Sequence, residues 1–214
     1  MKKILILLVA FASSFTFYAS AAQNASEGPV VDAGVGVGVY DKVEGTGVMF
    51  TQRVGVQWPV AKFGKKLSLS AGAYINNAYG SSTDILELEW NGKEIDELDF
   101  KTTRDDISIL PTASLNYSFS PSFEGYFGLG LGVGILTAKG SIDFDGEDPD
   151  DYAGADDLQK TNSTVCFAMS SYLGIRYYFS SNWAVNAQFG LIAGNFKSHA
   201  GSYNLLSAGV SYRF

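Results

Sequence analysis

The stretch "YFGLGLGVGIL", residues 126–136, indicates the fold of this chain, because glycine occupies every second position from Gly128 to Gly134. Apolar residues fill the positions between, from Phe127 to Ile135. Side chains of a β-strand point alternately to opposite faces, so this spacing predicts a strand with one apolar face and one nearly bare face. The glycines do not match G-x-G-x-x-G and no helical pattern follows, which excludes a phosphate-binding loop.

The same alternation recurs along the chain and predicts eight strands. They cover residues 31–40, 48–58, 67–75, 107–119, 123–137, 163–179, 183–193 and 203–214. These strands are longer than the about 5 to 6 residues common in soluble proteins, and their apolar faces carry no charge. Such strands suit a wall between lipid and a polar interior. We therefore predict an all-β fold, an eight-stranded antiparallel up-and-down transmembrane β-barrel.

The predicted connections alternate in length. Those at 59–66, 120–122 and 180–182 are short, whereas those at 76–106 and 138–162 are long. Short turns on one side and long loops on the other are typical of outer-membrane barrels, and an even strand count then places both termini in the periplasm. Within the first long connection, Asn91-Gly92 predicts a hairpin by which the third and fourth strands extend outward.

The acidic residues concentrate in the long connections, whereas the aromatic residues of the apolar face concentrate near the short turns. Residues 84–106 carry nine acidic and three basic side chains, and residues 139–160 carry eight and two. Aromatic residues on the apolar face gather near the short turns, where an interfacial girdle is expected. They are Trp58, Tyr117, Phe119, Phe123, Tyr177, Phe179, Trp183, Tyr212 and Phe214.

The first residues have the pattern of an export signal. Lys2 and Lys3 precede the apolar stretch "ILILLVAFASSFTF", and Ala19-Ser20-Ala21 fits a cleavage site. We therefore predict a cleaved signal peptide at residues 1–21 and a barrel domain at residues 22–214.

Composition limits the possible functions. The chain of 214 residues has 15 basic and 22 acidic side chains, and an acidic exported protein lacks the Lys and Arg clusters that bind nucleic acid. A single cysteine and a single histidine exclude a disulfide framework and a metal centre built from several such ligands. We expect no cofactor and no metal site.

The last predicted strand ends in "LLSAGVSYRF", and together with the rest of residues 22–214 it resembles a known family. With the export signal and the eight amphipathic segments, the chain resembles the small outer-membrane barrels, namely the outer-membrane protein A type transmembrane domain and its opacity and porin-like relatives. The resemblance implies a multi-pass protein of the bacterial outer membrane, in contact with lipid and lipopolysaccharide. It also implies that Tyr212 and Phe214 form part of the signal read by the barrel-assembly machinery.

Charged residues on the inward-facing side are the first candidate site. They are Asp32, Arg53, Glu124, Arg176 and Arg213. Because an isolated buried charge costs several kcal/mol or more, we predict ion pairs between Glu124 and Arg176, and between Asp32 and Arg213. This network either plugs the lumen or gates a narrow path. Pro111 lies inside the fourth strand, where it predicts a bulge or a strand start near Thr112.

Two loops offer further candidates. The acidic stretch with Asp143, Asp145, Glu147, Asp148, Asp150 and Asp151 either binds a divalent cation, bridging to lipopolysaccharide phosphates, or is simply solvated. Its spacing does not match an EF-hand. His199 lies close to Ser198 and Ser202, as in a lipid A-modifying enzyme, but no third catalytic group is evident.

We expect a non-enzymatic protein with a structural or surface-interaction role. A small pore or solute channel is the main alternative, and a lipid A-modifying enzyme that uses His199 is the third. The sequence identifies no extracellular ligand, because in such a widely reused fold the loops determine function.

Overall fold

The structure is a computed structural model that describes residues 28–42, 45–90, 94–143, 161–194 and 201–214. The predicted signal peptide, most of the acidic loop and His199 lie outside these ranges. Within them there is no helix of the length and apolarity needed to cross a membrane. Eight strands are present: β1 (Val30–Lys42), β2 (Gly45–Phe63), β3 (Leu67–Trp90), β4 (Glu94–Ser120), β5 (Phe123–Asp143), β6 (Thr161–Tyr178), β7 (Trp183–Gly194) and β8 (Gly201–Arg213).

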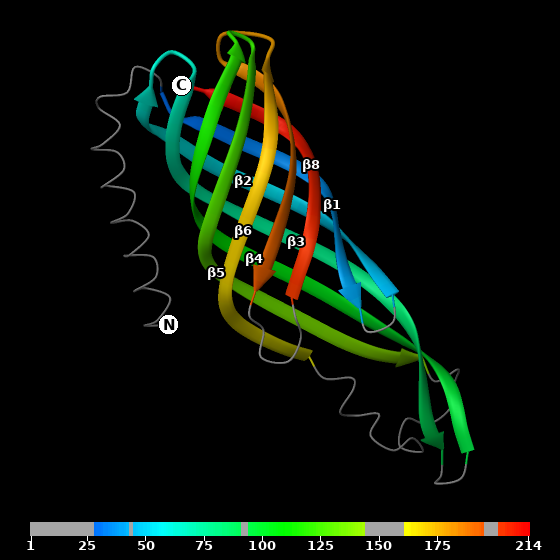
Figure 1. The fold of residues 1–214 in the computed structure, drawn as a ribbon. Helices are drawn as coiled ribbons and strands as arrows, with labels where there is room; N and C mark the ends of the chain where they lie inside the picture. The colour runs from blue at the N-terminus through cyan, green and yellow to red at the C-terminus, as the bar shows by residue number, and fades with distance from the viewer. Residues whose placement is uncertain (1–27, 43–44, 91–93, 144–160, 195–200) are drawn as a thin grey trace.

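The strands form a closed barrel in which each pairs antiparallel with its neighbours in sequence (Figure 1). The ring closes where β8 pairs with β1, from Val30 opposite Arg213 to Tyr40 opposite Tyr203. Closure satisfies the backbone on both edges of every strand, which a lipid-embedded sheet requires. The predicted fold class is confirmed. The described ends of the chain lie at the same end of the barrel as the turns 64–66, 121–122 and 179–182. We call this the turn end and the opposite one the loop end.

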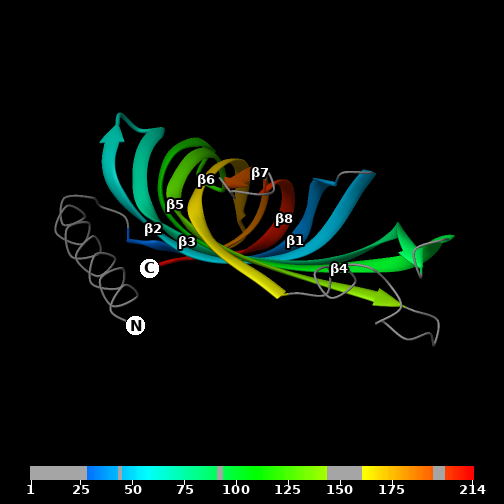
Figure 2. The same cartoon turned by 90° about the horizontal axis from the view of Figure 1, so that it is seen from below.

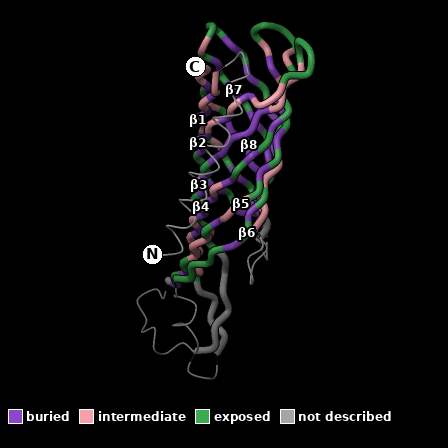
Figure 3. The backbone as a smooth tube through the Cα atoms, turned by 90° about the vertical axis from the view of Figure 1, so that its left-hand side faces the viewer, coloured by how far each residue is buried: buried purple, intermediate pink, exposed green. Residues whose placement is uncertain are grey.

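The two faces of the wall differ as the period-2 pattern predicts. Along β1, Val35, Val37 and Val39 are 54%, 49% and 41% exposed, whereas Asp32 is fully buried. Buried and exposed residues alternate along the other strands too (Figure 3). Apolar side chains therefore cover the outer wall, and the alternate, mostly polar residues of each strand fill the lumen. This distribution is the reverse of that in a soluble protein.

Several strands run further than predicted, and β3 and β4 most of all. Their pairing continues unbroken from Leu67 opposite Tyr117 to Trp90 opposite Glu94, so residues 76–90 and 94–106 are strand rather than loop. The pairing of β2 with β3 stops at Met49 opposite Gly80. Beyond it, β3, β4 and β5 run out to one side of the barrel (Figures 1 and 2). The predicted extension is thus present, while Asn91 and Gly92 lie outside the described residues.

The two strand prolines behave differently. The prediction for Pro111 is wrong: β4 runs through it, and the register with β3 and with β5 does not shift there. Instead, the pairing of β4 with β5 is interrupted between Ile109 and Thr112, as expected where a ladder lacks one N–H donor. The register shift of β2 occurs at the other proline, between Pro59 and Ala61.

The aromatic girdle forms at the turn end. Ring centroids of Tyr117 and Phe119 lie 5.0 Å apart, and the Tyr212 ring lies 4.8 Å from both Trp183 and Phe214. Tyr177 and Phe179 are more than half exposed on the same outer wall. The rings form contacting groups on the outer wall at this end, where amphipathic rings favour the membrane interface.

Candidate functional site: the barrel lumen

Arg176 on β6 is the centre of a buried ion network near the turn end. Its guanidinium is 2.7 Å from Glu124 on β5, directly opposite in the ladder, which agrees with the predicted pair. It also binds Asp32 on β1 through Nε and Nη2, at 3.3 and 2.8 Å. Only 1% of Arg176 is exposed, and its Cζ lies 4.3 Å from the centre of the Tyr126 ring. The whole cation is therefore enclosed by acceptors and an aromatic face.

Asp32 is satisfied from three directions. In addition to Arg176, it accepts a hydrogen bond from the Tyr74 hydroxyl at 2.7 Å and one from the Ser211 hydroxyl at 2.6 Å. These bonds occupy the about four acceptor positions of a carboxylate. The predicted pair of Asp32 with Arg213 is wrong, because the register sets Asp32 opposite Ser211 and moves Arg213 opposite Val30.

Arg213 instead extends the network toward the turn end. Its Nη2 lies 3.5 Å from Glu124 and donates to the Tyr178 hydroxyl at 2.5 Å. Its Cζ also lies 4.2 Å from the centre of the Tyr178 ring. Glu124 thus bridges two arginines, and the network links side chains from four strands, β1, β5, β6 and β8.

Three tyrosines form the next layer of the lumen. The Tyr172 ring lies 5.6 Å from Tyr74 and 6.2 Å from Tyr126, both in edge-to-face geometry. Each ring covers a glycine of a neighbouring strand: a Cβ on Gly128 would overlap Tyr172, and one on Gly174 would overlap Tyr126. The bare face of "YFGLGLGVGIL" therefore makes room for aromatic side chains in a crowded interior.

Arg53 faces the lumen as predicted, but it forms no ion pair among the described residues. It is 3% exposed, and its Nε, Nη1 and Nη2 atoms are buried without a hydrogen-bond partner there. Its Cζ lies 4.9 Å from the centre of the Tyr74 ring. Arg53 thus differs from Arg176 and Arg213, which both lie within 4 Å of a carboxylate.

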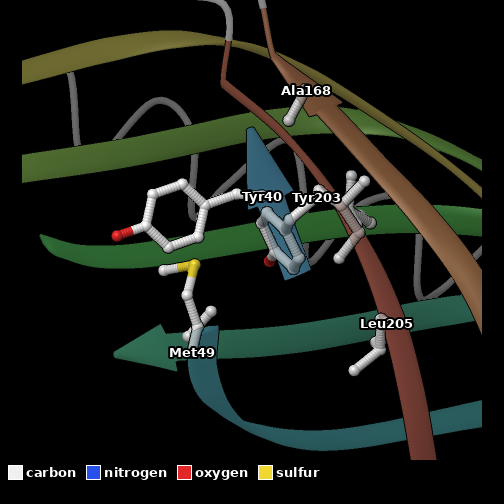
Figure 4. Packing of buried hydrophobic residues seen from close by; sticks show 8 residues of the cluster. Tyr40, Met49, Ala168, Tyr203 and Leu205 are labelled. Atoms are coloured by element: carbon white, nitrogen blue, oxygen red, sulfur yellow. The ribbon is translucent and has the colours of Figure 1, made fainter. Parts of the chain in front are cut away.

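The loop-end half of the lumen contains an apolar cluster, which the sequence reasoning missed. Its buried side chains, several of which Figure 4 labels, come from every strand except β5. Its members are Tyr40, Met49, Ala78, Leu110, Ala168, Ile192, Tyr203 and Leu205. Here β5 contributes Gly132, whose missing side chain leaves room for the β4 backbone to approach. Met49 and Leu110 are apolar residues at alternate strand positions that otherwise carry polar, inward-facing side chains. Such exceptions are the signal that could have predicted this cluster.

A second buried ion pair lies beyond the apolar cluster. Arg104 donates to Asp106 at 2.7 and 3.1 Å, and its Cζ lies 5.2 Å from the centre of the Tyr40 ring. Both residues were predicted to lie in an acidic loop. They belong instead to β4, because the strand continues past its apolar segment.

These layers show what the lumen can do chemically. Charged, aromatic and apolar side chains follow one another from the turn end to the loop end. The cavities between these layers measure about 10 to 20 Å³, whereas a larger one of about 350 Å³ lies at the turn end, where Glu124, Tyr178 and Arg213 line it. The described part of the chain contains no cluster of three metal-ligating residues. The arrangement places ion pairs, aromatic rings and apolar side chains across the lumen at successive heights.

Comparisons with known proteins agree with this architecture. A sequence model of the outer membrane protein beta-barrel domain matches residues 7–214. The Neisserial surface protein A has a similar structure, with a TM-score of 0.52 and 14% identity over 87% of this chain and 97% of that one. Attachment invasion locus protein of Yersinia pestis and the N-terminal barrel of Pseudomonas aeruginosa OprF also match, with TM-scores of 0.46 and 0.43. Their identities are 12% and 14%, over 88% of this chain and 98% of each of theirs. No curated protein sequence matches.

Proposed function

Because the chain belongs to the outer membrane protein beta-barrel domain family, we propose that it is a non-conducting barrel of the bacterial outer membrane with a structural or surface-interaction role. The observation that carries the proposal is the buried network around Arg176, in which one guanidinium holds two carboxylates from different strands. Such a network cross-links the barrel wall and closes its interior.

The proposal includes a second closure. The apolar cluster around Met49 and Leu110 excludes water at a different depth from the ion network. Opening a path for hydrated ions requires both layers to rearrange, whereas a single-gate channel needs only one. The two layers together therefore favour a plug over the small-pore alternative.

The proposed orientation places the turn end in the periplasm and the loop end outside the cell. Short turns, both described chain ends and the girdle gather at one end, as in barrels of this class. The sheet extension of β3, β4 and β5 then projects outward and offers a surface for an extracellular ligand. Tyr212 and Phe214 lie on the outer wall near the last residues of the barrel, where the assembly machinery would read them.

The acidic loop and His199 belong to this proposal only as surface features. Asp143 ends β5, while Asp145, Glu147, Asp148, Asp150 and Asp151 lie outside the described residues. A cation bridge from these carboxylates to lipopolysaccharide phosphates would anchor the extension at the membrane surface. We propose no enzymatic activity, since the hydroxyl groups in contact with Asp32, those of Tyr74 and Ser211, are buried in the ion network and out of reach of a substrate.

Single-channel recording in planar bilayers tests the proposal. The wild-type barrel should give no discrete conductance steps, because the charged and apolar layers block hydrated ions. A heat-dependent gel shift of the same preparation verifies that the barrel is folded. Reproducible steps from folded wild-type protein would overturn the plug and favour the pore alternative.

A further inference from the structure

Arg53 is a buried cation whose hydrogen-bonding capacity is unused within the described chain. A guanidinium has five N–H donors and no acceptor, and none of the three nitrogen atoms of Arg53 finds a partner there. The side chain is 3% exposed, so bulk water does not compensate it. The face of the Tyr74 ring lies 4.9 Å from Cζ. Burial of a guanidinium without hydrogen-bond acceptors costs free energy, so an acceptor beside its N–H groups would stabilise the barrel.

A small cavity lies beside this guanidinium. It measures about 10 Å³, comparable to the space of one water-sized sphere. Its polar lining includes Asn76, Ser170 and Gln188, together with Arg53 itself. The Gln188 carbonyl already accepts a hydrogen bond from Tyr126 at 3.3 Å, which leaves its amide N–H groups to face other partners. The lining therefore offers several donors.

The charge balance of this half of the lumen points the same way. In this half of the described lumen three arginines face inward, Arg53, Arg176 and Arg213, against two carboxylates, Asp32 and Glu124. Asp32 accepts four hydrogen bonds from other groups, and Glu124 is shared between two arginines. Neither carboxylate is left to neutralise Arg53, so one positive charge remains.

We propose that this cavity binds one small monovalent anion, chloride or another halide, on the Arg53 guanidinium. A halide accepts hydrogen bonds without donating any, so it can use the guanidinium N–H groups together with the amide and hydroxyl donors of the lining. The cavity size selects a monatomic ion over phosphate or a carboxylate. The bound ion neutralises the remaining charge and completes the network. This inference requires a closed barrel but not the absence of conductance.

Diffraction from crystals of the wild-type protein grown or soaked in sodium bromide tests the site directly. An anomalous difference peak should lie in the cavity within hydrogen-bonding distance of the Arg53 guanidinium. Density without anomalous signal identifies ordered water only, and that result overturns the proposal. The measurement needs no variant, so it decides the question even if Arg53 proves essential for folding.

Thermal unfolding in detergent provides the second measurement. At equal ionic strength, sodium chloride should raise Tm relative to sodium gluconate, by about 5 to 10 °C at a hundredfold excess over Kd. Arg53→Gln should remove this difference. Arg104→Gln is the matched control, because it removes a buried arginine from the other end of the lumen and should retain the chloride effect. Equal Tm values in the two salts, or a chloride effect that survives Arg53→Gln, contradict the site.

Discussion

The two halves of the lumen exclude water by different means. The turn-end half uses ion pairs around Arg176, in which each group depends on named partners across the barrel. The loop-end half uses the apolar cluster around Leu110, in which contacts are many and individually weak. A polar network requires specific partners. Removal of one member costs much stability, because the remaining charges stay buried without a partner. An apolar cluster instead loses stability in proportion to the volume removed.

The largest effect should come from Arg176→Ala. This change leaves Asp32, which is fully buried, and Glu124 without their shared cation. Breaking a buried pair in this way costs about 3 to 5 kcal/mol. Thermal or guanidinium unfolding in detergent measures the loss, and an unchanged unfolding midpoint would contradict the pairing.

A charge-free version of the same site serves as the control. Arg176→Met combined with Asp32→Asn and Glu124→Gln removes the ions together and keeps similar side-chain volumes. If stranded charge causes the loss in Arg176→Ala, this triple variant should recover part of the stability. A triple variant as unstable as Arg176→Ala would instead implicate packing of the arginine stem.

The apolar half should respond less sharply. Leu110 is 1% exposed within the cluster, and Leu110→Ala should cost about 2 to 3 kcal/mol, at the low end for a buried leucine. The flexible side chain of Met49, in the same cluster, can fill part of the space. Leu115→Ala is the matched control on the same strand, because Leu115 is 43% exposed on the outer wall. In detergent its loss should be smaller, and equal losses at the two positions would refute an apolar layer inside the lumen.

The contrast between the halves also shows what the sequence can predict. Period-2 alternation determines which face each residue takes, and this was sufficient for the barrel and for the inward position of all five charged residues. It does not determine height along the axis. Asp32 on β1 and Arg176 on β6 meet across the lumen because of strand tilt and register, which no local pattern encodes.

The apolar half and the long strands were missed for related reasons. Met49 and Leu110 are apolar at inward-facing positions that are otherwise polar. One such residue in a single strand, however, does not indicate that side chains from seven strands meet in one cluster. Alternation with an apolar face is required only where lipid surrounds the wall. Beyond it, β3 and β4 continue to pair out to Trp90 opposite Glu94, through residues 84–106, which carry nine acidic and three basic side chains. The uncharged apolar face that predicts the other strands is absent from this segment.

The glycines of β5 allow the finest test, because neighbouring positions on one face differ in the space around them. A Cβ on Gly132 would overlap the carbonyl oxygen of Ile109 on β4, whereas one on Gly134 would meet the Cys166 sulfur at 3.3 Å. Backbone cannot move aside as a side chain can. Gly132→Ala should therefore destabilise the barrel by about 1 to 3 kcal/mol. Gly134→Ala should be nearly neutral, because the entropy lost by the unfolded chain offsets slight crowding.

Guanidinium unfolding of both alanine variants in the same detergent measures the difference. The two substitutions are chemically identical and two residues apart, so propensity and solvation cancel between them. A larger loss at Gly132 means that close approach of β4 and β5 is needed to seal the apolar half, where β5 brings no side chain of its own. Equal losses would mean that the glycines serve the bending of the strand rather than the packing of the lumen, and the two halves would then differ only in their side chains.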